Sequence, residues 1–338
     1  MSQLQVGVIG YGYWGPNLVR NFTACPTTHV RAVADRDPKR RAAVKGLYPA
    51  IDVVEDPSRI LTDPAIDAVA IVTPLSTHFA FAKAALENGK HVLVEKPLAA
   101  SSKECDELTQ LARARGLTLM VDHTFVYTAA VQRIKAYVDA GELGRILYFD
   151  AVRINLGLFQ PDSNVIWDLS PHDLAILDYV LGFEPRWVAA LGACHYKDGV
   201  ENMAYITVGF DESVVAHLHV NWVSPIKVRR IMIAGTKKMV VYDDTEPSEK
   251  IKLYDAGMGV SHLDREGAHS MLVEYRTGDV LAPHLDRTEA LSRVTQSFEI
   301  ACRTGIPPLT DGAAGSRVVR LIEAAQRSLQ AQGSKVML

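Results

Sequence analysis

The sequence predicts an α/β protein with two domains, the first built on a parallel sheet and the second on a large, open, mostly antiparallel sheet. Up to residue 122, short apolar runs alternate with helical patterns, which is typical of parallel strands joined by helices. From residue 186 onward, several apolar runs follow one another with little helix between them, as in antiparallel sheets. A length of 338 residues fits two domains, which we place at residues 1–122 and 123–338.

Composition and charge exclude several classes of protein. The chain is 48% hydrophobic and 22% charged, so it is expected to fold, and its net charge of −3 argues against a broad nucleic-acid-binding surface. No run of 18 apolar residues is present, and no basic region precedes the first apolar run, so we expect no membrane partner and a cytoplasmic location. The four cysteines lack metal-site spacing, and we predict no metal.

A glycine-rich turn is the strongest local motif. The apolar run Leu4–Ile9 reads as a buried strand, and a helical pattern opens at Pro16. Between them lie Gly10, Gly12, Tyr13, Trp14 and Gly15. A second strand, Val30–Ala34, ends at Asp35, which comes 20 residues after Gly15. This order is the fingerprint of a Rossmann dinucleotide-binding domain, whose glycines allow close approach of the pyrophosphate while the acid accepts hydrogen bonds from the ribose.

Asp35 also bears on which dinucleotide binds. A carboxylate repels the 2′-phosphate of NADP, so Asp35 favours NAD. Arg36 follows directly and either grips that phosphate or stacks on the adenine, which leaves NADP open as the alternative.

Further polar residues follow the next predicted strands. We expect strands at Ala68–Val72, His91–Val94 and Leu117–Val121, and a helix opened by the capping box at Ser101. Ligands of such sheets bind beyond the carboxyl ends of the strands, where Asp35, Thr73 and Lys96 are expected to share one rim. In the second half, we expect Ser170 to cap a helix that starts at Pro171 and ends before Gly182, with Asp173 completing the cap. If the helix instead begins before Ser170, the four-residue spacing places Asp168 and His172 on one face.

Several motifs together resemble the Gfo/Idh/MocA oxidoreductases over essentially the whole chain. They are the glycine turn, Thr73-Pro74 with His78, Glu95-Lys96-Pro97, Asp168-x-x-x-His172, and the tail segments Pro283–Phe298 and Pro307–Gly312. The resemblance implies two-domain enzymes that act on a secondary alcohol of a sugar, inositol or nucleotide-sugar, often with a cis peptide before the proline of Glu-Lys-Pro. It also implies a homodimer or homotetramer. Ser170 and Ala175 depart from the usual motif, which puts the substrate in question more than the reaction class.

The resemblance implies a catalytic set of Lys96, Asp168 and His172. Imidazole suits the role of base, and Asp168 would set the tautomer of His172. The Lys96 ammonium would hold the substrate hydroxyl and stabilise alkoxide character, or would itself act as the base if burial lowered its pKa. Which of the two accepts the proton stays open at this point.

Around this set we predict two groups of binding residues. The cofactor-binding group comprises Gly10, Gly12, Tyr13, Trp14, Gly15, Asp35, Arg36, Thr73, Pro74, His78, Glu95 and Lys96. The substrate-binding group comprises Lys96, His123, Tyr127, Asn155, Trp167 and His172, although the aromatic residues suit core packing equally well. His217 and His219 share a strand face without a third ligand and are not read as a metal site.

The predicted function is an NAD(P)-dependent dehydrogenase acting on CH–OH groups. The segment Tyr13-Trp14-Gly15-Pro16-Asn17 resembles members that oxidise the C3 hydroxyl of a nucleotide-sugar. Inositol dehydrogenase is the alternative within this class. A non-catalytic dinucleotide sensor and a hydrolase using transient oxidation are alternatives outside it, and the presence of Lys96, Asp168 and His172 argues against the sensor.

Overall fold

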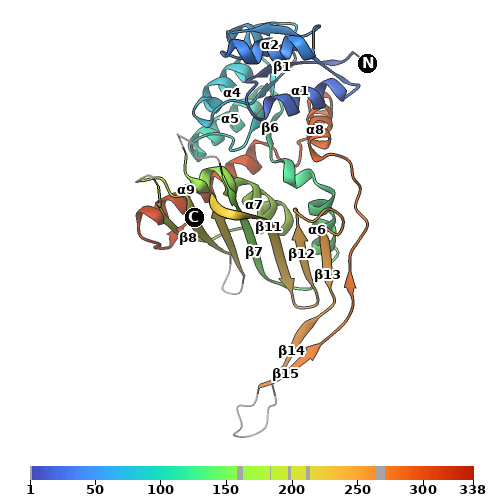
Figure 1. Ribbon diagram of the computed structural model, residues 1–338, viewed down its shortest axis with the longest axis vertical. Helices are drawn as coiled ribbons and strands as arrows, with labels where there is room; N and C mark the ends of the chain where they lie inside the picture. Colours follow the sequence, from blue (N-terminus) through green and yellow to red (C-terminus); the bar gives the residue numbers. More distant parts are fainter. Residues whose placement is uncertain (1, 158–162, 183, 197–198, 211–213, 263–270) are drawn as a thin grey trace. The chain divides into compact units, whose positions relative to one another are not determined.

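The computed structural model describes residues 2–157, 163–182, 184–196, 199–210, 214–262 and 271–338, and the chain folds into two compact units (Figure 1). The first unit comprises Met1–Thr128 and Arg287–Glu323, and the second comprises Ala129–Asp286 and Ala324–Leu338. The sequence analysis assigns everything after residue 122 to one domain. In the structure, residues 287–323 belong to the first unit.

Contacts between distant parts of the chain explain this return. Phe22 of α1 (Gly15–Ala24) and Phe298 of α8 (Ala290–Thr304) pack edge to face, with ring centroids 6.2 Å apart. The Arg20 guanidinium donates two hydrogen bonds, of 2.7 and 2.9 Å, to the Glu289 carboxylate. Burial of an aromatic pair stabilises such packing by its apolar area as well as by ring geometry.

Six parallel strands form the sheet of the first unit, in the order β3-β2-β1-β4-β5-β6. They are β1 (Leu4–Ile9), β2 (Thr28–Ala34), β3 (Asp52–Val54), β4 (Ala68–Ile71), β5 (His91–Glu95) and β6 (Leu119–Asp122). This is the strand order of the Rossmann fold, so the predicted fold is confirmed. The order reverses between β1 and β4, and ligands of this fold bind at that point, beyond the carboxyl ends of the strands.

Helices connect these strands largely where the sequence places them. They are α1, α2 (Pro38–Leu47), α3 (Ser58–Leu61), α4 (His78–Glu87) and α5 (Ser102–Ala114), with short 3₁₀ turns at Leu75–Thr77 and Thr124–Tyr127. The predicted cap of α5 is present, because the Ser101 hydroxyl accepts the Glu104 N–H at 3.2 Å. The Glu104 carboxylate in turn accepts the N–H of Ala100 at 3.1 Å.

The second unit is built on nine strands in the order β16-β13-β12-β11-β7-β10-β9-β8-β17. They are β7 (Ile146–Leu156), β8 (Trp187–Ala193), β9 (Met203–Gly209), β10 (Val215–Asn221), β11 (Val223–Gly235), β12 (Met239–Asp243), β13 (Ile251–Tyr254), β16 (Val280–Leu281) and β17 (Val336–Met337). Neighbouring strands are antiparallel except β7 and β10, so a mostly antiparallel sheet is confirmed.

Three helices and a hairpin complete this unit. α7 (Val165–Leu181) packs against β7, β9 and β10 and also contacts α6 (Ala129–Asp139). α9 (Gly312–Gln330) begins in residues of the first unit and ends in residues of the second. β14 (Gly257–His262) and β15 (Met271–Arg276) form a separate two-stranded hairpin, at the lower end of Figure 1. Among the described residues, no helix is long and apolar enough to cross a membrane.

The start of α7 corrects one sequence prediction. Asn164, not Ser170, caps the helix, because its side-chain oxygen accepts the N–H groups of Ile166 and Trp167. Ser170 lies inside the helix, where its hydroxyl donates to the Ile166 carbonyl at 2.6 Å, and Pro171 is also internal. The correction matters for the site, because Asp168 and His172, which are four residues apart in the sequence, both lie within one continuous helix.

Candidate active site

The glycine turn after β1 leaves room for a ligand close to the backbone. Gly10 has a φ of +99°, and a Cβ there would lie 2.3 Å from the Val72 carbonyl oxygen. A Cβ on Gly15 would lie 2.5 Å from the Gly10 carbonyl oxygen, so neither position accepts a side chain. A Cβ on Gly12 would lie 3.5 Å from the nearest atom, a guanidinium nitrogen of Arg40. Tyr13 is 88% exposed. This shape fits a dinucleotide pyrophosphate at the N-terminus of α1.

Asp35 follows β2 and is held firmly at this turn. Its two carboxylate oxygens accept the N–H groups of Tyr11 at 2.7 Å and Asp37 at 2.8 Å. The side chain of Asp35 is only 6% exposed, whereas that of Arg40 is half-exposed and lies 3.5 Å away. Arg36 is exposed. The sequence analysis did not single out Arg40, which stands in a run of basic residues with no distinguishing spacing.

His78 connects two of the predicted motifs. It is buried, and its ring nitrogens lie 2.8 Å from the carbonyl oxygens of Thr73 and Pro97. The peptide between Lys96 and Pro97 is cis, as the resemblance implies. His78 therefore bridges the ends of β4 and β5 through their backbones, and its ring serves to position Thr73, Pro74 and Pro97.

Lys96 follows β5 directly and lies among titratable groups. Glu95 and Asp122 are register partners across β5 and β6, and their carboxyl groups are hydrogen-bonded. Burial raises the pKa of Glu95 well above its usual range, and the neighbouring Asp122 raises it further. Asp122 accepts hydrogen bonds from the Trp14 indole at 3.1 Å and the Thr124 hydroxyl at 2.6 Å. The sequence analysis did not select Asp122.

His123 and Tyr127 follow β6 in the same unit. Both ring nitrogens of His123 are buried without a hydrogen-bond partner in the described structure. Burial, together with the nearby charge of Lys96, lowers the pKa of His123 to about 3, so its imidazole is neutral at physiological pH. Tyr127 is buried, and its hydroxyl lies 3.3 Å from that of Thr310 and 3.5 Å from that of Ser297. Those contacts match the core-packing alternative for Tyr127.

In the second unit, α7 presents Asp168 and His172 on one face. A separation of four residues makes them neighbours on a helix surface, and both are partly exposed. The Asp168 carboxylate accepts a hydrogen bond of 2.9 Å from the indole of Trp222, a residue the sequence analysis missed. A hydrogen bond between Asp168 and His172 stays a prediction. Trp167 lies on the same helix and Asn155 near the end of β7, both partly buried.

Trp222 is itself closely packed. It is 1% exposed, and a Cβ on Gly157 would lie 2.3 Å from its ring. The backbone N–H of Gly157 donates to the Trp222 carbonyl at 2.8 Å, which joins the end of β7 to the residue between β10 and β11. The indole that holds Asp168 is thus positioned by the sheet.

A buried ion pair fastens α7 to the sheet. Asp173 accepts two hydrogen bonds, of 2.9 and 2.7 Å, from Arg153 on β7, and both side chains are nearly fully buried. The structural role of Asp173 is therefore this ion pair, and the capping role expected from the sequence is wrong. Removing one member leaves the other charge buried without compensation.

Asp173→Ala is therefore expected to lower the free energy of unfolding by about 3–5 kcal/mol. Denaturant titration followed by tryptophan fluorescence measures this in the second unit, which holds three of the four tryptophans. The double variant Arg153→Met/Asp173→Leu is the control and should recover most of the loss. A loss below about 1 kcal/mol, the range of a surface ion pair, would contradict the assignment.

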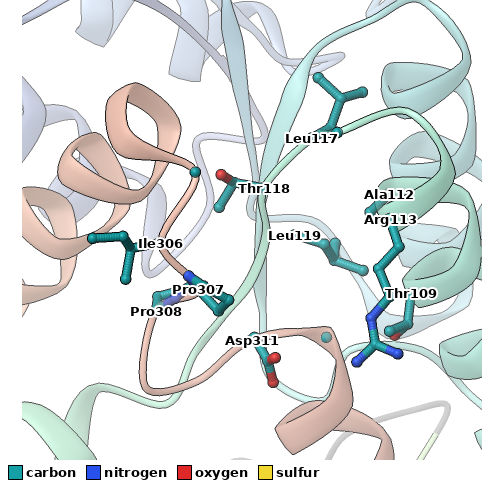
Figure 2. Close-up of a pocket in the computed structure, with 13 residues that line it drawn as sticks. Thr109, Ala112, Arg113, Leu117, Thr118, Leu119, Ile306, Pro307, Pro308 and Asp311 are labelled. Atoms are coloured by element: carbon teal, nitrogen blue, oxygen red, sulfur yellow. The ribbon is translucent and has the colours of Figure 1, made fainter.

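A cavity of about 300 Å³ lies elsewhere in the first unit (Figure 2). It is lined by the end of α5, by residues 116–119, by residues 305–308 and by Asp311 and Gly312. None of the predicted site residues lines it, and we assign it no part in the chemistry.

The fold and the glycine turn define a dinucleotide-binding protein. The family model described as "Oxidoreductase family, NAD-binding Rossmann fold" matches residues 4–123, and that of the GFO/IDH/MocA C-terminal domain matches residues 131–241. The chain belongs to the Gfo/Idh/MocA family.

Relatives indicate the chemistry found within this family. UDP-N-acetylglucosamine 3-dehydrogenase of Acidithiobacillus ferrooxidans is 30% identical over 94% of this chain and 95% of that protein. The NAD(+)-dependent scyllo-inositol 2-dehydrogenase of Bacillus subtilis is 31% identical over 66% of this chain and 68% of its own length. A crystal structure of the former enzyme superimposes with a TM-score of 0.80 at 28% identity, covering 98% of this chain and 99% of that one.

Proposed function

We propose that the protein is an NAD-dependent dehydrogenase that oxidises a secondary alcohol of a sugar, with the C3 hydroxyl of a nucleotide-sugar as the favoured target. The similarity to UDP-N-acetylglucosamine 3-dehydrogenase along nearly the full length of both chains carries this proposal. The retention of Lys96, Asp168 and His172 supports catalysis over dinucleotide sensing. An inositol substrate is the second candidate, favoured by the similarity to scyllo-inositol 2-dehydrogenase.

The residues are assigned roles that their chemistry fits. NAD, when bound, accepts the hydride from the carbinol carbon. The glycine turn holds the pyrophosphate, and Asp35 accepts hydrogen bonds from the adenosine ribose. We assign Lys96 the role of binding the substrate hydroxyl and stabilising its developing negative charge. We assign His172 the role of proton acceptor, with Asp168 positioning its imidazole.

His123 is a further candidate for a polar contact in the first unit. Its neutral imidazole carries one N–H donor and one acceptor nitrogen, neither of them used by the described part of the chain. A buried polar group without a partner is costly, so a ligand that satisfies it gains affinity. We propose that His123 makes this contact with the bound substrate or nicotinamide, while Asn155 and Trp167 contribute to sugar binding.

Absorbance at 340 nm tests the function directly. The pure protein is mixed with NAD or NADP and with UDP-sugars, free sugars, sugar phosphates and inositols. NADH formation with a UDP-sugar is the expected result, and formation with inositols alone would favour the second candidate. Tight NAD binding without turnover in either direction would support a sensor instead, and the absence of any dinucleotide binding would contradict the proposal.

Asp35→Ser is expected to weaken NAD binding about 10–100-fold, because a hydrogen bond to a charged group contributes about 1.5–3 kcal/mol. Binding of NADP should change less, since the substitution removes the charge that repels its 2′-phosphate. Calorimetric titration with both nucleotides measures the ratio.

Asp52→Ser removes an exposed carboxylate from neighbouring β3 and serves as the matched control. Arg40→Ala tests the guanidinium beside Asp35 and should lower any NADP binding. Equal losses of NAD and NADP affinity in Asp35→Ser would contradict a role for Asp35 in selecting NAD.

A further inference from the structure

The paired carboxyl groups of Glu95 and Asp122 require a proton between them. Ionised carboxylates only accept hydrogen bonds, so two that are hydrogen-bonded to each other must share one proton. Their place in the sheet enforces the contact, because the two residues are register partners at the ends of β5 and β6. The pair also sits beside the residue proposed to bind substrate, since Lys96 is next to Glu95 in the chain.

The surrounding donors decide which carboxyl group is ionised. Asp122 is 1% exposed and accepts hydrogen bonds from two other side chains, the Trp14 indole and the Thr124 hydroxyl. In the part of the chain that the structure describes, Glu95 accepts one hydrogen bond outside the pair, from the backbone N–H of Lys96 at 3.0 Å. Hydrogen bonds to a charged oxygen favour the ionised form, so the negative charge belongs on Asp122 and the proton on Glu95.

We propose that Glu95 is a neutral carboxylic acid at physiological pH, that it donates its proton to Asp122, and that this pair positions Lys96 relative to the glycine turn. The chain of hydrogen bonds runs from the Trp14 indole through Asp122 and Glu95 to the backbone of Lys96. Trp14 immediately precedes α1, so one network joins the cofactor turn to the ends of β5 and β6.

The shared proton also sets the charge around Lys96. With Glu95 neutral, the pair carries one negative charge beside the Lys96 ammonium, and His123 adds none because burial holds its pKa at about 3. With both groups ionised, two adjacent negative charges would repel each other and break the network. Glu95 is thus a positioning residue in this proposal. The role assigned to Lys96 rests on the proposed function, whereas the protonation of Glu95 does not.

Infrared spectroscopy of the full-length protein at pH 7 tests the protonation without a substrate. The carbonyl stretch of a protonated carboxylic acid is expected in the wild-type protein and lost in Glu95→Gln. Glu87→Gln, which removes an exposed glutamate at the end of α4, should leave the band unchanged. A spectrum without that band, or a band that persists in Glu95→Gln, would overturn the proposal.

Affinity for NAD tests the positioning role. An amide can donate to Asp122 and accept from the Lys96 N–H as a neutral acid does, so Glu95→Gln should bind NAD within about threefold of wild type. Glu95→Ala should bind about tenfold more weakly, the loss of one or two buried hydrogen bonds. A glutamine variant as weak as the alanine variant would overturn this role.

The outcomes separate this inference from the proposed function. An acid band that depends on Glu95, in a protein that oxidises no alcohol, would leave the inference standing and remove the function. Oxidation of a sugar by a protein without that band would support the proposed function and overturn the inference about Glu95. In an active protein, Glu95→Ala should lower kcat more than Glu95→Gln does, whereas a glutamate that worked as an anion or as a proton acceptor would lose as much in either variant.

Discussion

Lys96→Met is expected to lower kcat about 10²–10⁴-fold, the usual effect of removing one group that stabilises transition-state charge or transfers a proton. Methionine keeps much of the aliphatic stem and removes the ammonium, so the end of β5 should remain packed. The Glu95–Asp122 pair then loses the Lys96 cation beside it, and its remaining negative charge further disfavours a developing alkoxide. Initial rates at saturating NAD and substrate measure the effect.

Two controls separate a catalytic role of Lys96 from a structural one. Lys103→Met, an exposed position on α5, should leave the rate unchanged. Lys96→Met should also bind NAD with nearly wild-type affinity, because we assign the main NAD contacts to the glycine turn and Asp35. A Lys96→Met variant that turns over within about tenfold of wild type would contradict the role, since that is less than the usual contribution of such a group.

The parts of the fold that the sequence predicts well are those governed by neighbouring residues. Gly10 is required by its positive φ, and Gly15 by the Gly10 carbonyl oxygen, which would lie 2.5 Å from a Cβ there; both constraints are local to the turn after β1. The Ser101 cap likewise depends on a residue three positions away. Such features leave a pattern in a short window of sequence. The parallel sheet likewise follows from the alternation of strands with helices.

The start of α7 shows where local signals fail. Ser170 followed by Pro171 is a typical start of a helix, and the sequence analysis took it as one. The helix instead begins six residues earlier, because Asn164 caps it and also donates to Glu201 at 2.7 Å and Gln326 at 2.8 Å. These partners lie 37 and 162 residues away in the sequence, so no pattern in the residues around Asn164 predicts these hydrogen bonds.

The missed site residues have the same cause. Asp122 resembles any polar residue at the end of a strand, and its importance arises from the register that places it opposite Glu95. Trp222 holds Asp168 from 54 residues away and reads in the sequence as an ordinary strand residue. Long-range hydrogen bonds between side chains leave no periodic trace, whereas the proposed ligand-binding residues carry recognisable motifs.

Asp168→Asn separates the charge of this residue from its structural contact. The amide oxygen of asparagine can still accept the hydrogen bond from the Trp222 indole, so the packing of α7 should be preserved. If Asp168 assists His172 by its charge, kcat should fall while the melting temperature stays near that of the wild type.

His172→Gln is expected to lower kcat about 10²–10⁴-fold, the contribution of a positioned general base. Glutamine keeps a polar side chain at this partly exposed position of α7 but cannot accept the proton at neutral pH. Because a base must be unprotonated to act, kcat/KM of the wild type should fall on the acid side of its pH profile, and this limb should vanish in the variant. Rates between pH 5 and 9 measure both effects.

His284→Gln is the matched control, since His284 is an exposed histidine of the second unit, and its pH profile should be that of the wild type. The same measurement distinguishes the two candidates for the base. If Lys96 accepts the proton, the acid limb will persist in His172→Gln and will be lost in Lys96→Met. If His172 accepts it, Lys96→Met will be slower at every pH and will keep the limb, because the variant still contains His172.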